Sequence, residues 1–463
     1  MLHGEKPSRL LRSLRVFVVN RVPYIQPEGT LIFGGGNFTN GETSANEIAR
    51  FKALKKIGAQ MCRMSLYPHV YYDEAQRQPT PALLDTAMSQ AYRFRITPMV
   101  LFEYAGRYAD PAKTNPVIPL GDRRKWFSIG QAFARRFKPN GEWAKAKGIR
   151  DWGVTVFTAI NEPDSDDTKN NCIPLQAYRE TLEGLADGAH SVDSSLKVLP
   201  GGFASANAAS DYTLRGYGPA IAELFDKGRL DGLDLHTYYD VQYAPLEGTY
   251  QFSAQYNFDQ VKRASGIKAD INFYSTEFNY AKRGPDDTFM SEEIAAKGFL
   301  TGIWDHVGVV RNDGATRATQ FAFPWNIFLT ASEYPHYGLA LQLDPWTPTA
   351  RGRVLQMVIE KTSGMTFESL DPKRKGEYML IGPGKKMWVW QNRPHWTNHP
   401  GTSYTINGIP RGAVKIEVYG WDGLRQMVKL SGQTSYTIRN LKPGETYMFL
   451  STAREMSGRL RED

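Results

Sequence analysis

The chain has 463 residues, 41% of them hydrophobic and 12% aromatic, and a formal net charge of +8. This length favours one large domain with a smaller one beside it. Basic residues are scattered without a nucleic-acid-binding motif, and no apolar run is long enough to span a membrane, so neither nucleic acid nor a bilayer span is indicated.

Residues 1–29 are interpreted as an N-terminal extension. A β-hairpin predicted at 14–27 can pack with the large domain or with the smaller C-terminal one. The basic start contains only a short apolar run and no small-residue cleavage site, which makes it a poor signal peptide. Two locations stay open: the cytoplasm, or the periplasm or cell exterior if a leader was removed.

From residue 30 onward, short β-type runs alternate with amphipathic helical segments. In the first helical segment, Ile48, Phe51, Leu54 and Ile57 share one face. The eight β-type runs are 30–38, 59–67, 96–104, 153–162, 196–203, 232–239, 271–278 and 318–325. This alternation predicts a parallel sheet covered by helices, and the count of eight favours a closed (β/α)₈ TIM barrel over an open sheet.

Cofactor and metal motifs are absent from these segments. The run "GGGNFTNG" (34–41) lacks both glycine patterns of nucleotide-binding loops. The run "DSDD" (164–167) lacks the glycine and distal glutamate of a calcium loop, so a solvated loop is the better interpretation. Cys62 and Cys172, the only cysteines, are expected to be free thiols, although one bridge stays open. We therefore predict no metal and no cofactor.

The hydrophobic pattern of the sequence changes after the helix predicted at 351–364. Alternating and β-branched runs separated by Gly, Pro and Asn turns fill residues 366–455, which predicts an antiparallel β-sandwich. We expect a barrel domain at 30–364 and a sandwich domain at 365–463, packed together. Trp388, Trp390 and Trp396 leave glycan binding by the sandwich open, although alternation predicts that Trp388 and Trp390 share a core or interdomain face.

Active sites of such barrels lie at the C-terminal ends of the strands. Several polar and aromatic side chains fall at these ends and are therefore candidates for a shared site. They are Arg63, Glu103, Tyr104, Asn161, Glu162, His236, Tyr238, Glu277 and Trp325.

Glu162 and Glu277 each end an apolar run, "VTVFTAINE" and "INFYSTE". A carboxylate at a buried strand end is costly unless it is partnered or used. The fourth and seventh strands lie on opposing sides of an eight-stranded barrel, so the two carboxylates are expected to face each other. Such a pair can hydrolyse a glycosidic bond. A lone glutamate at a strand end is more often a salt-bridge partner or a cap, so the inference depends on the pair.

With these residues the chain resembles the clan of retaining (β/α)₈ glycoside hydrolases whose acid/base and nucleophile follow strands 4 and 7. The run "AINEPD" is similar to the clan's Asn-Glu-Pro signature. The resemblance implies that Glu162 is the acid/base, that Asn161 binds the sugar 2-hydroxyl and that Glu277 is the nucleophile.

The resemblance extends to supporting residues over about residues 30–362. It implies that Arg63 lies near the nucleophile, that His236 and Tyr238 occupy the strand-6 position, and that Trp325 floors the cleavage subsite. The chain departs from many clan members at the end of strand 3, where Glu103 and Tyr104 replace His or Trp and are candidate substrate contacts.

Within the clan, the run "YGLALQLDPWTPTARGRVLQMV" and the C-terminal β-domain are most similar to the β-xylosidases and exopolysaccharide hydrolases of family 39. The implied partner is a poly- or oligosaccharide, and the oligomeric state is open. The aromatic segment 240–257 and the segment 103–120 are candidate cleft walls, which favours endo cleavage of a bacterial exopolysaccharide. Exo action on β-xylosides or other β-glycosides, and a non-catalytic glycan-binding barrel, are the alternatives.

Overall fold

The computed structural model describes residues 31–38, 44–66, 72–73, 75–79, 81–103, 121–163, 174–204, 216–239, 253–281, 290–327, 330–368, 376–393 and 401–453. Each of the eight predicted β-type runs overlaps at least one strand. The N-terminal extension, Tyr104, Cys172 and Trp396 lie outside the described residues.

Two parallel sheets occupy the centre of the larger part of the molecule. The order in the first is β1 (Gly34–Phe38), β2 (Met61–Leu66), β5 (Thr97–Phe102), β6 (Val156–Ala159) and β7 (Lys197–Pro200). In the second, β10 (Asn272–Tyr280) lies between β11 (Thr319–Pro324) and β8 (Gly232–Asp234), and it also pairs with β9 (Thr237–Tyr239). Isolated parallel bridges, Phe33 to Ala322 and Phe203 to Leu235, join the sheets at both edges.

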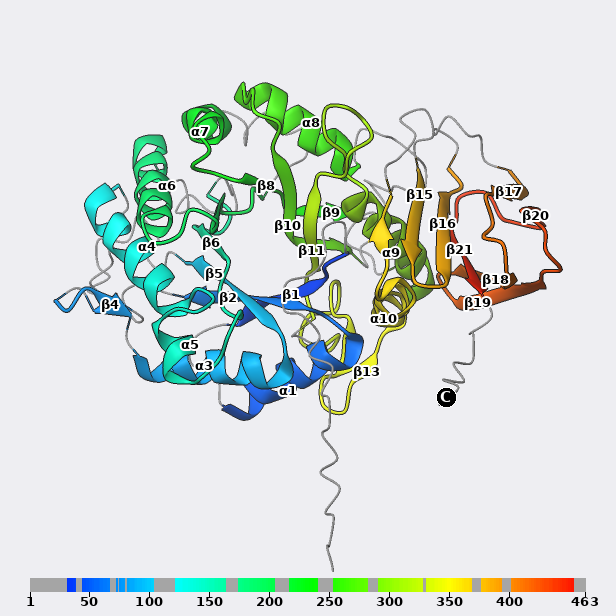
Figure 1. The fold of residues 1–463 in the computed structure, drawn as a ribbon, viewed down its shortest axis with the longest axis horizontal. Coiled ribbons are helices and arrows are strands. Elements are labelled where there is room, and N and C mark those ends of the chain that lie inside the picture. Colours follow the sequence, from blue (N-terminus) through cyan, green and yellow to red (C-terminus); the bar gives the residue numbers. More distant parts are fainter. Residues whose placement is uncertain are drawn as a thin grey trace, which may run out of the picture.

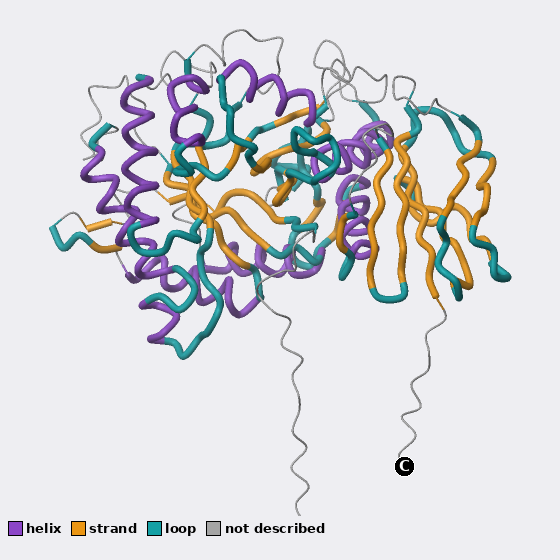
Figure 2. Tube along the Cα trace, turned by 45° about the horizontal axis from the view of Figure 1, so that its top comes forward, coloured by secondary structure: helices purple, strands orange, loops and turns teal. Residues whose placement is uncertain are grey.

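Helices surround these strands (Figures 1 and 2). They are α1 (Ser44–Ile57), α3 (Pro81–Phe94), α4 (Arg123–Phe137), α5 (Glu142–Ala146), α6 (Leu175–His190), α7 (Tyr217–Asp226), α8 (Ala254–Ser265), α9 (Glu292–Val307) and α10 (Ala350–Thr362). Ser253, Ser291 and Thr349 cap α8, α9 and α10 by accepting a bond from a backbone N–H of the first turn. Short pairs of strands lie beside them: β3 (Tyr72–Asp73) with β4 (Gln78–Pro79), and β12 (Ala340–Gln342) with β13 (Thr347–Pro348).

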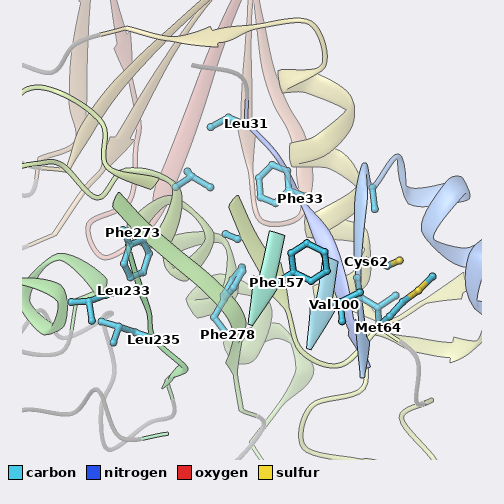
Figure 3. Packing of buried hydrophobic residues seen from close by; sticks show 14 of the residues in the cluster. Leu31, Phe33, Cys62, Met64, Val100, Phe157, Leu233, Leu235, Phe273 and Phe278 are labelled. Carbon is cyan, nitrogen blue, oxygen red and sulfur yellow. The ribbon is translucent and has the colours of Figure 1, made fainter. Parts of the chain in front are cut away.

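Alternate side chains of β2 point to opposite faces and pack into two different hydrophobic clusters. This is why β2 is buried along its whole length. Cys62 and Met64 pack in the larger core (Figure 3), and the Cys62 thiol is free and buried as expected. Met61 belongs instead to a separate cluster with side chains from five other strands. Its other buried members are Met99, Val156, Leu199, Tyr274, Phe321 and Phe323.

The C-terminal part is antiparallel, as the sequence pattern predicts. One sheet has the order β14 (Thr366–Phe367), β15 (Glu377–Gly382), β16 (Lys385–Gln391), β21 (Thr446–Ala453), β18 (Ala413–Gly420) and β19 (Gly423–Lys429). A second pairs β17 (Ser403–Asn407) with β20 (Ser435–Arg439). Residues of both sheets share a hydrophobic cluster that includes Trp388 and Trp390. Both tryptophans are buried, so neither offers an exposed ring for glycan binding.

Helix α9 connects the two parts of the molecule. Asp305 on this helix accepts hydrogen bonds from Gln391 Nε2 at 3.0 Å and from Arg393 Nη2 at 2.9 Å. Thr301 and Thr446 are joined through their hydroxyls at 2.8 Å. Within the described residues, the helices are too short or too polar to cross a bilayer.

Candidate active site

Arg63 occupies the interior of the strand arrangement, two residues after Met61 on β2. Its side chain is 1% exposed. Nη1 donates to Asn161 Oδ1 at 3.3 Å and to Thr276 Oγ1 at 2.9 Å, while Nη2 donates to Glu277 Oε1. The guanidinium fork therefore joins groups that follow β6 to groups on β10, which are far apart in the sequence.

Glu162 stands at the end of a strand that stops earlier than predicted. The β-type run was expected to reach residue 162, but β6 ends at Ala159. Ile160 and Glu162 have φ angles of 69° and 47°, a backbone region that non-glycine residues and above all β-branched ones avoid. The turn points Asn161 and Glu162 into the site, and such local strain is concentrated at functional sites.

Glu277 lies on β10 and is the more enclosed of the two glutamates. Its side chain is 6% exposed, against 28% for Glu162. Arg63 donates to one carboxylate oxygen of Glu277, and the hydroxyl of Tyr238 donates to the other. The pairing of β10 with β11 is irregular between Ser275 and Phe278, which flank this residue.

His236 connects the two glutamates. Its Nδ1 lies 2.8 Å from Glu162 Oε1 and 3.7 Å from Glu277 Oε2. One ligand-type atom from each of the three residues lies within 4.8 Å of the other two. The two carboxylates predicted from the sequence therefore come together in the structure.

A buried hydrogen-bond chain lies behind the Nε2 side of the His236 ring. Asp234 accepts from the Thr276 backbone N–H at 2.9 Å and from its hydroxyl at 2.7 Å. The Thr276 oxygen is then an acceptor toward Arg63 and toward His236 Nε2, which lies 2.9 Å away. Nε2 must therefore carry a proton, and Nδ1 is the nitrogen that shares a proton with Glu162.

The ring of His236 is seated against backbone that has no room for a side chain. A Cβ placed on Gly202, just after β7, would lie 2.0 Å from His236 Nε2. The same glycine accepts the backbone N–H of Glu162 through its carbonyl at 3.1 Å. Gly202 thus positions both His236 and the segment that carries Glu162.

Charges at the site shift the pKa values of its members in opposite directions. Burial alone would raise the pKa of Glu277, but the charges of His236 and Arg63, with hydrogen bonds from Tyr238 and Arg63, lower it. Burial would lower the pKa of His236, but the negative charge of Glu277 and the hydrogen bond to Glu162 raise it to about 9. Glu277 is therefore held ionised beside a cationic imidazole at neutral pH.

Glu103 supplies a third carboxylate near the pair. It follows β5 immediately and continues the inward-facing series that contains Met99. Burial raises its pKa to about 7, against the opposing effects of Arg63 and of a hydrogen bond from Ser65. This carboxyl group is partly protonated near neutral pH and can both donate and accept hydrogen bonds.

Aromatic rings form a wall beside Glu277. The ring of Trp325, just after β11, meets Tyr238 edge-on with centroids 6.0 Å apart. Tyr337 lies 5.4 Å from Tyr238 and 5.3 Å from Trp325. Tyr334 lies 5.1 Å from Trp325 and is 39% exposed.

The trio of Glu162, His236 and Glu277 has the spacing of metal ligands. However, Arg63 already donates to Glu277, and its Nη1 lies 3.5 Å from His236 Nε2. A permanent guanidinium charge so close repels a second cation. The arrangement is therefore better suited to carboxylate chemistry than to metal binding.

Solved structures with similar architecture include several glycoside hydrolases. A glucosidase from Croceicoccus marinus aligns with a TM-score of 0.61 and 13% identity, over 93% of this chain and 98% of the glucosidase. A family 39 β-xylosidase from Caulobacter crescentus aligns with a TM-score of 0.56 and 12% identity, over 91% of this chain and 96% of the xylosidase. A family 86 enzyme in complex with neoagarooctaose aligns with a TM-score of 0.57 and 14% identity, over 92% of this chain and 75% of that enzyme.

The chain has the fold of these glycoside hydrolases. No protein-family model and no curated protein sequence matches it. The expected resemblance to family 39 is thus confirmed at the level of the fold, at 12% sequence identity.

Several residues of the site were not among the sequence candidates. Asp234 and Thr276 were missed, although a buried Asp within the apolar run "GLDLH" is an available signal. Tyr334 and Tyr337 were missed because the segment after β11 has no periodicity that predicts its path. Six of the predicted site residues share one hydrogen-bonded network: Arg63, Asn161, Glu162, His236, Tyr238 and Glu277. Trp325 borders this network, and Glu103 interacts electrostatically with Arg63. Tyr104 lies outside the described residues.

Proposed function

We propose that the protein is a retaining glycoside hydrolase that cleaves β-glycosidic bonds by double displacement, with Glu277 as nucleophile and Glu162 as acid/base. The observation that carries this proposal is the approach of the two carboxylates, whose facing oxygens lie within 4.8 Å of each other. Retaining enzymes hold their carboxyl groups about 5–5.5 Å apart, whereas inverting enzymes leave about 6.5–9.5 Å for a water molecule.

In the first step, the ionised Glu277 attacks the anomeric carbon while Glu162 protonates the departing glycosidic oxygen. The bond to the leaving group breaks, and a covalent glycosyl ester forms on Glu277. In the second step, Glu162 removes a proton from water, which attacks the anomeric carbon and releases Glu277. The greater exposure of Glu162 suits a residue that must reach both a leaving group and water.

The neighbouring residues fit supporting roles in this chemistry. Arg63 and Tyr238 hold the two oxygens of Glu277 and keep it ionised until it attacks. Asn161, fixed by Arg63, is proposed to bind the 2-hydroxyl of the sugar. His236 shares its Nδ1 proton with Glu162, and Trp325 is proposed to stack on the sugar ring.

We propose a (β/α)₈ barrel at residues 30–364 and a C-terminal β-sandwich at 365–463. The barrel is supported by the two parallel bridges, which link the end strands of both sheets, and by the cluster that six strands enclose. The sandwich is supported by the hydrophobic cluster that both antiparallel sheets share.

The proposed substrate is a β-linked poly- or oligosaccharide. Proteins with this fold include a glucosidase, a β-xylosidase and an enzyme solved with neoagarooctaose, so the fold is compatible with small and with polymeric substrates. We propose endo cleavage of a bacterial exopolysaccharide, with exo action as the alternative. An array of oligosaccharides and exopolysaccharides separates the two, because endo cleavage gives products of mixed length.

Replacement of Glu277 by Gln tests the assignment of the nucleophile. The variant keeps the shape of the side chain but cannot form the glycosyl ester, so we expect turnover of an accepted glycan to fall by about 10³-fold or more. Unchanged turnover would remove Glu277 from this role. Absence of turnover by the unmodified protein across the whole array would favour a non-catalytic glycan-binding barrel.

A further inference from the structure

A second cavity shares no described lining residue with the glutamate site. It lies by the β3–β4 hairpin, which projects beside α4 (Figure 1). Its volume is 810 Å³, within the range of ligand-binding pockets. Among the lining residues that the structure describes, Arg77, Arg123, Arg124 and Lys125 are basic and Asp187 is acidic. Basic side chains therefore outnumber acidic ones in this part of the lining.

The basic residues at the start of α4 contradict the usual electrostatics of a helix. Arg123, Arg124 and Lys125 fill the first turn, which contains no acidic residue. The partial positive charge of a helix N-terminus disfavours cations and favours anions. The N-cap Asp122, whose side chain accepts from the Lys125 backbone N–H at 3.1 Å, offsets part of this unfavourable charge, and a bound anion would offset more.

Acidic neighbours pair with some of these cations. Arg123 pairs with Asp187 at 2.6 Å and with Glu183 at 3.6 Å, and both carboxylates also pair with Arg229. Arg77 and Arg124 are exposed and form no ion pair with another described residue. Arg77 also has a φ angle of 51°, so the hairpin holds this cation at the cavity in a backbone region that non-glycine residues avoid.

We propose that this cavity binds a segment of an anionic oligosaccharide, one that carries carboxylate or sulfate groups. The planar guanidinium group of an arginine binds such groups with two parallel hydrogen bonds. The Phe127 ring, which is half-buried, supplies an apolar surface for sugar C–H groups, and Ser128 and Gln131 supply hydroxyl and amide groups for sugar hydroxyls. Tyr72, the other aromatic residue of the described lining, is buried and packs on Phe133, so Phe127 is the one described ring available, fewer than the row of stacking rings that binds single-stranded nucleic acid.

The choice of a carbohydrate rests on the proposed function, whereas the preference for an anion rests on the cavity itself. The described lining residues come from the β3–β4 hairpin, α4 and α6, and none of them belongs to the network around Glu162 and Glu277. A second contact at this place would hold a long acidic chain on the enzyme while another segment occupies the glutamate pair, and would raise the apparent affinity for polymers.

The test is calorimetric titration of the full-length protein carrying Glu277→Gln, so that binding is measured without turnover. The probes are hexagalacturonate, a sulfated carrageenan hexasaccharide, neutral cellohexaose and inorganic phosphate. We expect at least one anionic hexasaccharide to bind, and to bind about tenfold more weakly when Arg77→Ala and Arg124→Ala are added together. The matched control, Lys429→Ala with Arg439→Ala, removes the same charge from two exposed positions of the C-terminal sheets and should leave binding unchanged.

Equal binding by the two double variants, or no binding of either anionic hexasaccharide, would overturn the proposal. Phosphate binding as tight as that of the hexasaccharides would show a general anion site and overturn the carbohydrate assignment. If the unmodified protein cleaves no glycan while the anionic hexasaccharides still depend on Arg77 and Arg124, the proposed hydrolysis fails and this binding site stands.

Discussion

At the scale of single residues, the site depends on Arg63. This side chain holds Glu277, Thr276 and Asn161 at once, and it is almost fully buried. Lysine keeps the charge but donates hydrogen bonds from a single nitrogen, so it cannot reproduce the planar set of donors of the guanidinium group. Arg63 is therefore a residue at which a change that conserves charge should still impair function.

We predict that Arg63→Lys lowers kcat/KM by about 100-fold, because at least one charge-assisted hydrogen bond to the site is lost. Steady-state kinetics on an accepted glycan, together with a thermal melt that shows a folded variant, measure this effect. Arg439→Lys, at an exposed position, is the control that should leave the kinetics unchanged. Kinetics of Arg63→Lys within twofold of the parent would contradict the assigned role.

His236 gives the site a pH dependence whose sign follows from its pKa. Folding raises the pKa of this imidazole from 6.5 to about 9, through Glu277 and Glu162 and against the effect of burial. Its stabilisation is therefore complete below pH 6.5 and is lost as the pH rises toward 9. Glu103 acts in the same direction at lower pH, because burial raises its pKa from 4.5 to about 7.

We predict that the free energy of unfolding falls by on the order of 2 kcal/mol between pH 6.5 and 9, and that His236→Gln removes most of this slope. Denaturant titrations at several pH values measure both curves. The comparison isolates His236, since other titrating groups are shared by the two proteins. Parallel curves for the parent and the variant would show that His236 does not carry the proton assigned to it.

At the scale of elements, the ends of β6 and β7 bring the site together. The chain turns at Ile160 through an unfavourable φ angle and presents Asn161 and Glu162. Gly202 follows β7 and leaves space for the ring of His236, which would otherwise meet a Cβ at 2.0 Å. These two turns determine the distance between Glu162 and His236.

We predict that Gly202→Ala lowers kcat by roughly tenfold or more while the protein remains folded, because the added methyl group displaces His236 from Glu162. Kinetics and circular dichroism of the variant measure this. Gly148→Ala is a suitable control: its φ angle of 66° makes it mildly strained, but no atom lies within 4 Å of the added Cβ. Equal losses of activity in the two variants would show a general rather than a local effect.

Much of this arrangement follows from sequence, because buried strands and their polar ends have a readable pattern. Glu277, Arg63 and Glu162 end or interrupt apolar runs, and their strand order brings them to one site. The end of β6 was predicted three residues too late, because the sequence does not reveal the positive φ of Ile160. Asp234 and Thr276 depend on the register between β8 and β10, which no local pattern encodes.

At the scale of the whole molecule, α9 joins the parallel and antiparallel parts. Asp305 and Arg393 form an ion pair whose side chains are 1% and 2% exposed. One hydrophobic core includes residues of the parallel strands together with Met387 and Val389 of β16. The two parts are therefore expected to unfold together.

We predict that Asp305→Ala lowers the free energy of unfolding by about 3–5 kcal/mol, because Arg393 loses its buried carboxylate. Denaturant unfolding followed by tryptophan fluorescence measures this. Lys415→Ala removes a partly exposed ion pair with Glu417 and should change the free energy by less than about 1 kcal/mol. A loss of under 1 kcal/mol in Asp305→Ala would show that the two parts are not coupled through this pair.

The central claim, that Glu277 and Glu162 perform a double displacement, is tested most directly by the configuration of the first product. A panel of aryl β-glycosides and β-linked oligosaccharides identifies an accepted substrate, and proton NMR then follows its hydrolysis before the product mutarotates. Facing oxygens within 4.8 Å predict that the first product is the β-anomer. An α-anomer as the first product would show an inverting reaction and contradict the account.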